Sequence, residues 1–587
     1  MNPIPRSEYP RPQLRRAEWR CLNGLWSVRG DDRREGLLKG WHRAGLGPEA
    51  LSIIVPFTPE APASQAEALR GLPCLWYERE FDAPPWGGPI MLHFGAADHW
   101  TRVFLNGEEV GQHRGGYAPF SFEISHALRP GRNRLTVRVE DSPSWSQPRG
   151  KQAGTTRWPI DYDPVTGIWQ SVWLEPVPPS SVSWLYPRYA FKDQTLVLAA
   201  GFSRQLQGRL SVTLLHNEVV VAEHTVGVDQ RAEARLSFAI PDPQLWAPEH
   251  PTLYDVRVVL EDELDGQVDR VEGYIGLREL SWDRDGLHLN GEALFLRGVL
   301  DQGYFPEGWY TAPSDEALRR DVELTLALGF NCARKHQKAE DPRYLYWADR
   351  LGLLVWAEMP SGRIFSTELV ETLTQEWMSL LKRDRAHPSL VTWVPFNESW
   401  GVWHQGDRPE QRAWVDSIVK LTKALDPSRP VVGNDGWEYS SGDFWTLHLY
   451  EEDRPLEDRL AALRQAPEST VTSDWGGAPG RARRGALPGA EVSMLPMLLT
   501  ECGGIGFGDA GGGAFAYGDI PETEHAFQRR IEQTLGEIAA SPSLAGYVWT
   551  QLTDVQQEIN GLLTFDRQPK LALETLRALF SQAGPRP

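Results

Sequence analysis

Short runs in which apolar and polar residues alternate dominate the first 280 positions of the chain. Ile90, Leu92 and Phe94 would share one face of an extended segment, because successive side chains of a strand point to opposite sides. Asn106-Gly107 follows another such run and is the dipeptide most typical of a two-residue hairpin turn. The pattern therefore predicts antiparallel sheets, without long helices, for this part of the chain.

A proline-rich stretch divides the β-rich region in two. Residues 176–179 have the composition of a linker, so residues 1–179 are predicted to form one antiparallel sandwich. Residues 180–280 continue the alternation, for example at Leu210, Val212 and Leu214, over a length that suits an immunoglobulin-like sandwich. No cluster of catalytic residue types stands out in this second segment, so we interpret it as a brace.

After Gly286 the pattern changes to strands that alternate with helices. The helix expected after Asp341-Pro342 has an N-cap residue, a proline at its first position and a terminating Gly352. This alternation predicts a (β/α)8 TIM barrel over residues 281–587, with glycine-rich loops at 476–491 and 503–518 near its mouth. The eight expected strands are 294–296, 330–334, 353–356, 391–401, 430–433, 444–448, 497–500 and 546–549.

Charge and cysteine content exclude several classes of function. A net charge of -19 argues against nucleic acid as a partner, because such binding needs a basic surface. No run approaches the roughly 18 apolar residues of a membrane span, and the N-terminus lacks a signal-like core, so a cytoplasmic protein is expected. Four scattered cysteines without CxxC spacing predict free thiols, and we expect no metal site and no cofactor. The oligomeric state stays open, a homo-oligomer included.

Two glutamates follow predicted barrel strands and are candidates for catalysis. Glu398 comes after Asn397 at the end of the fourth strand, and Glu501 ends the seventh. Both would face the same mouth of the barrel, where the carboxyl ends of the strands meet. Glycoside hydrolysis needs one carboxyl group to protonate the leaving oxygen and a second to attack the anomeric carbon or to activate water. A separation of about 5 Å would predict a retaining mechanism.

Motifs along nearly the whole chain carry a resemblance to a known family. They are Leu22-Asn23-Gly24-Leu25-Trp26, Trp76-Tyr77-Glu78-Arg79, Val165-Thr166-Gly167-Ile168-Trp169, His387-Pro388-Ser389, Asn397-Glu398-Ser399 and Thr500-Glu501-Cys502-Gly503-Gly504. With the order of the three domains, they resemble glycoside hydrolase family 2, which includes β-galactosidases, β-glucuronidases and β-mannosidases. The resemblance implies that residues 1–179 form a jelly-roll domain of the sugar-binding type.

The resemblance also implies roles for individual residues. Glu398 would be the general acid/base, Glu501 the nucleophile, and Asn397 the partner of the sugar 2-hydroxyl. Five further residues match family positions near the sugar: Tyr450 would hold the nucleophile, Arg334 would lie beneath it, Trp549 would form an aromatic platform, and His448 and Asp161 would contact the sugar. The alternatives are core packing for Tyr450 and Trp549, a surface salt bridge for Arg334 and a turn role for Asp161.

One departure from the family pattern bears on the substrate. Glucuronidases of the family carry an Asn-x-Lys clamp for the sugar carboxylate, where this chain has Gln557-Glu558-Ile559-Asn560-Gly561. Without that lysine and with an added glutamate, a neutral sugar is favoured. We therefore expect an exo-acting retaining β-glycosidase for neutral sugars, with β-galactosides first. The alternatives are β-mannoside, β-glucoside, galactofuranoside or arabinoside activity, β-glucuronidase activity, and a non-catalytic carbohydrate-binding protein.

Overall fold

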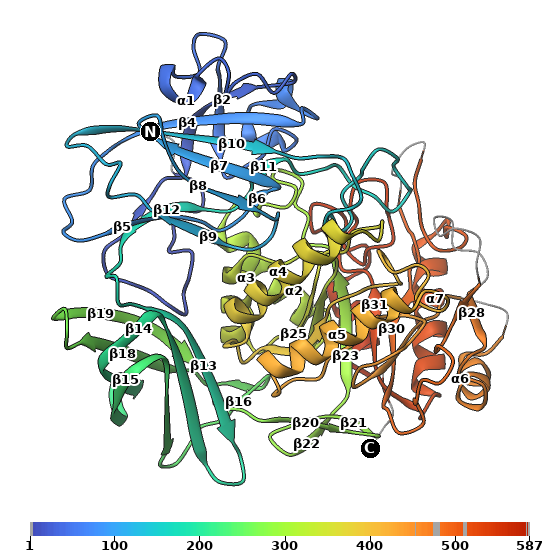
Figure 1. The fold of residues 1–587 in the computed structure, drawn as a ribbon. Helices are drawn as coiled ribbons and strands as arrows, with labels where there is room; N and C mark the ends of the chain where they lie inside the picture. The colour runs from blue at the N-terminus through green and yellow to red at the C-terminus, as the bar shows by residue number, and fades with distance from the viewer. Residues whose placement is uncertain (1–3, 452–453, 473–481, 509–512, 583, 585–587) are drawn as a thin grey trace.

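The computed structural model describes residues 4–451, 454–472, 482–508, 513–582 and 584. Two β-sandwiches and a barrel follow one another along the chain, with the first sandwich over one end of the barrel and the second along its side (Figure 1). The predicted fold class is confirmed. The division of the chain after residues 179 and 280 is kept as a proposal, and parts of the two expected mouth loops, 473–481 and 509–512, lie outside the described residues.

The first sandwich pairs a four-stranded with a six-stranded antiparallel sheet. Ile90, Leu92 and Phe94 all point into its core, as their alternation predicts, and Asn106 and Gly107 form the two-residue turn with positive φ angles of 53° and 89°. In the four-stranded sheet the strand order is β1 (Arg20–Cys21), β12 (Val172–Pro176), β5 (Ile90–Phe94), β9 (Phe120–Glu123). In the six-stranded sheet it is β3 (Leu51–Val55), β2 (Gly24–Gly30), β4 (Cys74–Asp82), β10 (Arg132–Glu140), β7 (Trp100–Leu105), β8 (Glu108–Arg114). A short pair, β6 (Ala97–Asp98) and β11 (Gly167–Ile168), and a one-turn helix α1 (Trp41–Ala44) complete it.

The second sandwich is immunoglobulin-like and is built on two unusually long strands. Leu210, Val212 and Leu214 of the longer strand are fully buried, so the alternation again predicted the inward face. Its sheet contains β13 (Val182–Ala190), β14 (Thr195–His216), β18 (Tyr254–Asp262) and β19 (Gln267–Ile275), with β15 (Val219–Ala239) paired to β14. Two small antiparallel sheets lead into the barrel. The first pairs β16 (Trp246–Ala247) with β17 (His250–Pro251), and the second contains β20 (Leu280–Asp283), β21 (Gly286–Leu289) and β22 (Glu292–Leu294).

The barrel wall is a curled parallel sheet. Its strands, in spatial order, are β26 (Leu390–Val394), β25 (Leu354–Glu358), β24 (Cys332–Lys335), β23 (Leu296–Asp301), β31 (Leu544–Thr550), β30 (Met497–Gly503) and β27 (Trp445–His448). The helices are α2 (Asp315–Ala327), α3 (Pro342–Leu351), α4 (Thr367–Asp384), α5 (Pro409–Leu425), α6 (Leu456–Gln465), α7 (Glu524–Ala539) and α8 (Leu573–Gln582). Two short strands, β28 (Thr470–Thr472) and β29 (Arg483–Arg484), pair in the antiparallel sense. None of the described helices is both long and apolar enough to cross a membrane.

Three predicted barrel strands differ in the structure. The fourth, expected over 391–401, ends at Val394. The expected strand at 294–296 is split between β22 and β23. The expected fifth strand at 430–433 is reduced to isolated bridges, of which one pairs Trp393 with Val431. Pro430 has no amide to donate, and the amide of Val431 bonds the Asp443 side chain at 2.7 Å, so a regular ladder does not form. Backbone bonds between this segment and Trp393, and one from His448 to the carbonyl of Gly436, still close the wall.

Candidate active site

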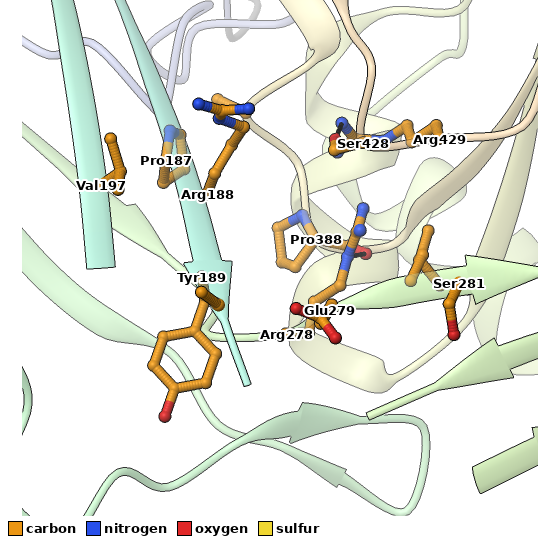
Figure 2. Close-up of a pocket in the computed structure, with 14 residues that line it drawn as sticks. Pro187, Arg188, Tyr189, Val197, Arg278, Glu279, Ser281, Pro388, Ser428 and Arg429 are labelled. Atoms are coloured by element: carbon orange, nitrogen blue, oxygen red, sulfur yellow. Dashed lines mark hydrogen bonds between the residues drawn. The ribbon is translucent and has the colours of Figure 1, made fainter. Parts of the chain in front are cut away.

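The cavity shown in Figure 2 lies at the end of the barrel opposite the predicted site. It has a volume of about 430 Å³ and is formed between strand β13, at Arg188 and Tyr189, and residues that precede barrel strands, at Pro388 and Arg429. Residues that precede the strands mark the amino-terminal face of the barrel, which in this fold contributes to stability, whereas active sites lie at the carboxyl-terminal face. The site is therefore to be found at the other end.

Glu398 and Glu501 meet at the carboxyl-terminal mouth of the barrel. Glu501 lies within β30, and Glu398 follows β26 by four residues. One side-chain atom each of Glu398, His448 and Glu501 lies within 4.8 Å of the other two, so the two carboxyl groups are close neighbours. Glu398 has a φ of 51°, in the left-handed region where a non-glycine residue is strained, a feature that often accompanies functional sites. The predicted pair is brought together.

Arg334, at the end of β24, lies beneath Glu501 as expected. Its Nη1 donates to Glu501 Oε1 at 3.1 Å, and its other nitrogens bond Glu358 at 2.8 Å and Asp435 at 2.9 Å. The guanidinium is completely buried, so it is held by carboxylates on three sides without competition from water. The alternative of a surface salt bridge is excluded.

Asn397 and Tyr450 complete the shell around the two glutamates. Asn397 Oδ1 accepts a bond of 2.6 Å from Arg334, which fixes the amide, while its buried Nδ2 has no hydrogen-bond acceptor among the described residues. That N–H donor suits a hydroxyl group of a bound sugar. The hydroxyl of Tyr450 donates to Glu501 Oε2 at 2.6 Å. Both residues lie where the sequence places them, and their roles stay proposals.

His448, the last residue of β27, lies between the two glutamates. Its Nδ1 is 2.8 Å from Glu398 Oε1, and its Nε2 is 3.1 Å from Asp435 Oδ2. Burial alone would lower the pKa of the imidazole, but the charges of Glu501 and Asp435 raise it to about 10. Both ring nitrogens are thus protonated and occupied. The structure places His448 where it orients Glu398 and Asp435, and its contact with the sugar stays a prediction.

The surroundings separate the pKa values of the two glutamates. Burial and the charge of Glu501 raise the pKa of Glu398, so that it keeps a proton at higher pH than an ordinary glutamate. Burial would also raise the pKa of Glu501, but His448 and Arg334 outweigh it and lower that pKa. Opposite shifts in two adjacent carboxyl groups are typical of an acid paired with a nucleophile.

The same three residues, Glu398, His448 and Glu501, are close enough to share a metal ion. A metal-ligating imidazole must be neutral, whereas the raised pKa keeps His448 protonated. Arg334 also brings a fixed positive charge to Glu501. A metal ion at this cluster would therefore have to displace a proton from His448.

The structure contradicts the expected sugar platform at Trp549. The side chain points outward from β31 to helix α8, where it packs edge-on against Phe580 with ring centroids 5.1 Å apart. Because residues of a strand alternate between the two faces of the barrel wall, Thr550 and not Trp549 occupies the inward parity at the end of β31. The alternative of core packing is correct here.

Asp161 also differs from its predicted role. Both of its carboxylate oxygens bond the guanidinium of Arg363, and one of them also accepts from the amide of Trp158 at 2.8 Å. The side chain is completely buried. Asp161 therefore anchors Arg363 beside the mouth, and direct contact with a sugar is not supported. The sequence offered no signal for this partner, which is 202 residues away.

Five residues of the site were not predicted as part of it. Asp435 and Glu358 hold Arg334, and His336 lies beside Glu358. His336 Nδ1 is 3.0 Å from Glu358. Glu558, noted only as a departure, and Lys151, from the first sandwich, are both buried close to the mouth. Glu358 is the last residue of β25 and lies two residues beyond the predicted strand 353–356, a position at the carboxyl end of a barrel strand that could have identified it.

Two adjacent carboxyl groups with opposed pKa shifts, at the mouth of a TIM barrel, are typical of the class of enzymes that cleave glycosidic bonds. Comparison with protein families gives the same class. Models of glycosyl hydrolases family 2 match in three parts: the sugar binding domain over residues 19–178, a second domain over 201–278 and the TIM barrel domain over 283–445. The chain therefore belongs to glycoside hydrolase family 2, a family of glycosyl hydrolases.

Relatives with two different activities match the chain. It is similar to the β-glucuronidase of Paenibacillus borealis, at 26% identity over 99% of both chains, and to the β-galactosidase of Thermoanaerobacter pseudethanolicus, at 27% identity over 61% of this chain. The match spans only 48% of that β-galactosidase, and the chain spans about half the length of several curated relatives.

Solved structures share the fold over nearly the whole chain. The β-glucuronidase from Ruminococcus gnavus in complex with D-glucuronic acid has a TM-score of 0.77 at 22% identity and covers 98% of this chain and all of its own. A family 2 β-galacturonidase from Eisenbergiella tayi, bound to glycerol, has a TM-score of 0.74 at 22% identity over 99% of both chains. At this level of identity the likeness concerns the fold alone.

Proposed function

We propose that the chain is an exo-acting retaining β-glycosidase that hydrolyses terminal neutral β-glycosides, with β-galactosides as the first candidates. The observation that carries the mechanism is the proximity of Glu398 and Glu501, whose nearest side-chain atoms lie within 4.8 Å. Retaining enzymes place their carboxyl groups about 5 Å apart, whereas inverting enzymes leave room for a water molecule between them.

The geometry supports a reaction in two displacements. Glu501, ionised beside Arg334, attacks the anomeric carbon while Glu398 gives its proton to the departing glycosidic oxygen. The covalent glycosyl-enzyme is then attacked by water, which returns a proton to Glu398 as the sugar leaves Glu501. Asn397 would donate its Nδ2 hydrogen to the sugar 2-hydroxyl, a bond that strengthens in the transition state.

A second candidate is hydrolysis of β-hexuronides. The full-length match to a β-glucuronidase favours it. The buried carboxylate of Glu558, where the family's uronate clamp would lie, favours a neutral sugar because it would repel a second carboxylate. A panel of nitrophenyl β-hexosides and β-hexuronides separates the two candidates directly.

Substitution of the two glutamates tests the mechanism. We expect Glu501→Ala to lower kcat by at least about 1000-fold, because no other group forms the covalent intermediate. Azide should restore turnover only to Glu398→Ala, with a β-glycosyl azide as the product detected by NMR. The proposal is abandoned if neither substitution lowers turnover tenfold on a substrate that the unaltered protein cleaves.

A further inference from the structure

A loop of the first sandwich, residues 149–152, lies against the mouth of the barrel. The amides of Arg149 and Gly150 both donate to the carbonyl of Ser361, at 3.1 and 3.0 Å. A Cβ atom at Gly150, whose φ is 56°, would lie 2.2 Å from the carbonyl oxygen of Gln337, so only glycine allows this approach. The loop is thus fixed on the turns that follow β24 and β25.

The fixed loop carries Lys151 into the site. Only 5% of this residue is exposed, and its ammonium lies 5.4 Å from the centroid of the Trp400 ring. No hydrogen bond or ion pair of this ammonium occurs within the part of the chain that the structure describes. Burying a lysine charge is costly unless it finds a partner, so its three N–H donors are available to a ligand.

The carboxylate of Glu558 lies across the same part of the mouth. It accepts hydrogen bonds from the hydroxyl of Tyr162 and, at 3.0 Å, from Asn560 Nδ2. The amide of Tyr162 in turn donates to the carbonyl of Lys151 at 2.9 Å. One tyrosine therefore links the lysine loop to the glutamate loop.

The charges of the two side chains oppose each other. Burial raises the pKa of Glu558, and Lys151 is the strongest influence that lowers it. Lys151 also lowers the pKa of Glu398, the proposed acid/base. A second set of bonds, from Arg157 to Gln556 and Gln557 at 2.8 and 3.0 Å, holds the two loops together at their outer ends.

We propose that Lys151 and Glu558 form a two-domain clamp that determines sugar specificity by holding a hydroxyl group of a neutral sugar. The ammonium of Lys151 donates a hydrogen bond to that hydroxyl and the carboxylate of Glu558 accepts one from it. The clamp is balanced in charge, so a hexuronate would bring an uncompensated carboxylate beside Glu558 and Glu501. This inference rests on the proposed function and names the class of sugar that the site accepts.

Kinetics of the full-length Lys151→Met variant test the clamp. On the nitrophenyl β-hexoside that the unaltered protein cleaves best, we expect KM to rise at least tenfold while kcat changes less than threefold. Lys151→Arg should recover part of the affinity, because it retains the charge. Lys39→Met, at an exposed position of the same domain, is the matched control and should leave KM unchanged. An unchanged KM in Lys151→Met, with its thermal unfolding midpoint retained, overturns the proposal.

Deoxy substrates locate the contact. One of the 3-, 4- or 6-deoxy nitrophenyl hexosides should lose at least tenfold in kcat/KM with the unaltered protein and lose nothing further in Lys151→Met. If the loss in kcat/KM from the missing hydroxyl and the loss from Lys151→Met add independently for all three deoxy sugars, Lys151 does not contact any of these hydroxyl groups.

Hexuronides test the charge argument. Glu558→Gln should raise the ratio of hexuronide to hexoside kcat/KM at least tenfold. If the unaltered protein prefers a hexuronide and Lys151→Met removes that preference, Lys151 binds a carboxylate and the proposal is wrong. Turnover that depends on Glu501 in every variant shows separately that the proposed mechanism holds even where the clamp does not.

Discussion

Arg334 is the residue through which the parts of the site influence one another. Its buried guanidinium contacts Glu501, Glu358 and Asp435, and it also fixes the Asn397 amide that is expected to meet the sugar. A planar guanidinium with five donors can satisfy this many acceptors at once, which a lysine cannot. The orientation of the proposed nucleophile and that of the proposed sugar contact therefore depend on one side chain.

Tyr450→Phe tests the control of Glu501 by its neighbours. The lost hydrogen bond of 2.6 Å lowers the pKa of Glu501, so its removal should raise that pKa and move the acidic limb of the kcat/KM profile to higher pH. We expect kcat to fall about 100-fold, as for the loss of one donor to a reacting oxygen.

The matched control is Tyr547→Phe, which removes a buried tyrosine hydroxyl outside the site, 3.4 Å from the carbonyl of Phe580. It should leave both the profile and kcat unchanged. An acidic limb that stays in place in Tyr450→Phe would show that Tyr450 does not tune Glu501.

Among single residues, the sequence predicted those that lie at the ends of expected strands. It did not predict those that reach the site only through packing of distant segments. Glu398 and Glu501 were predictable because each follows a buried strand and matches a family motif. Asp435 was not, because it lies two residues beyond the expected strand 430–433 and belongs to none of the family motifs. Lys151 belongs to another domain, and no local pattern indicates that its loop is pressed against the barrel.

Among the elements, β31 shows how alternation decides the role of an aromatic residue. Tyr547 and Trp549 share the outward parity of this strand and face helix α8. The motif placed Trp549 at a strand end, but motif position alone does not specify the face of the wall on which a side chain lies. Register, which pairs Trp549 with Val299 and Cys502, supplies that information.

Trp549→Phe separates the two interpretations. Since the ring packs on Phe580, the substitution should lower the free energy of unfolding by about 1–3 kcal/mol through lost core contacts. KM should stay within twofold of its original value. Phe580→Leu, on the other side of the contact, should also lower the free energy of unfolding measured with denaturant and leave KM unchanged within twofold. A tenfold rise in KM for Trp549→Phe alone would restore the sugar-platform role.

On the scale of the whole molecule, a buried glutamate joins the first sandwich to the barrel. Glu376 of helix α4 accepts hydrogen bonds from the amides of Tyr117 and Ala118 at 2.7 and 2.9 Å. Burial raises its pKa to about 7, which those amides only partly offset. The folded protein thus binds this proton more tightly than the unfolded chain, where a glutamate has a pKa of about 4.3.

The contribution of Glu376 to the free energy of unfolding should fall as the pH rises. Between the unfolded and the folded pKa values the unfolded chain ionises first, so the contribution of Glu376 is lost from about pH 4.5 to about pH 7. Glu376→Gln keeps an acceptor without a charge. It should be more stable than the unaltered protein at pH 8.5, by on the order of 2 kcal/mol, and equal to it at pH 4.

Thermal unfolding at both pH values measures the difference. Glu371→Gln, at an exposed position of the same helix, serves as the control and should show no such dependence. Equal midpoints for Glu376→Gln and the unaltered protein at pH 8.5 would contradict the argument.

The loop at 149–152 has a consequence for how enzymes of this build diversify. The strands that carry Glu398 and Glu501 belong to the barrel, and the loop that carries Lys151 belongs to the first sandwich; many hydrogen bonds join the two, among them those of Arg149 and Gly150 to Ser361 and of Tyr162 to Glu558. If the proposed clamp holds, substitutions within this loop change the sugar preference while the two glutamates stay in place. Reaction chemistry and substrate choice would then be encoded by different parts of the gene.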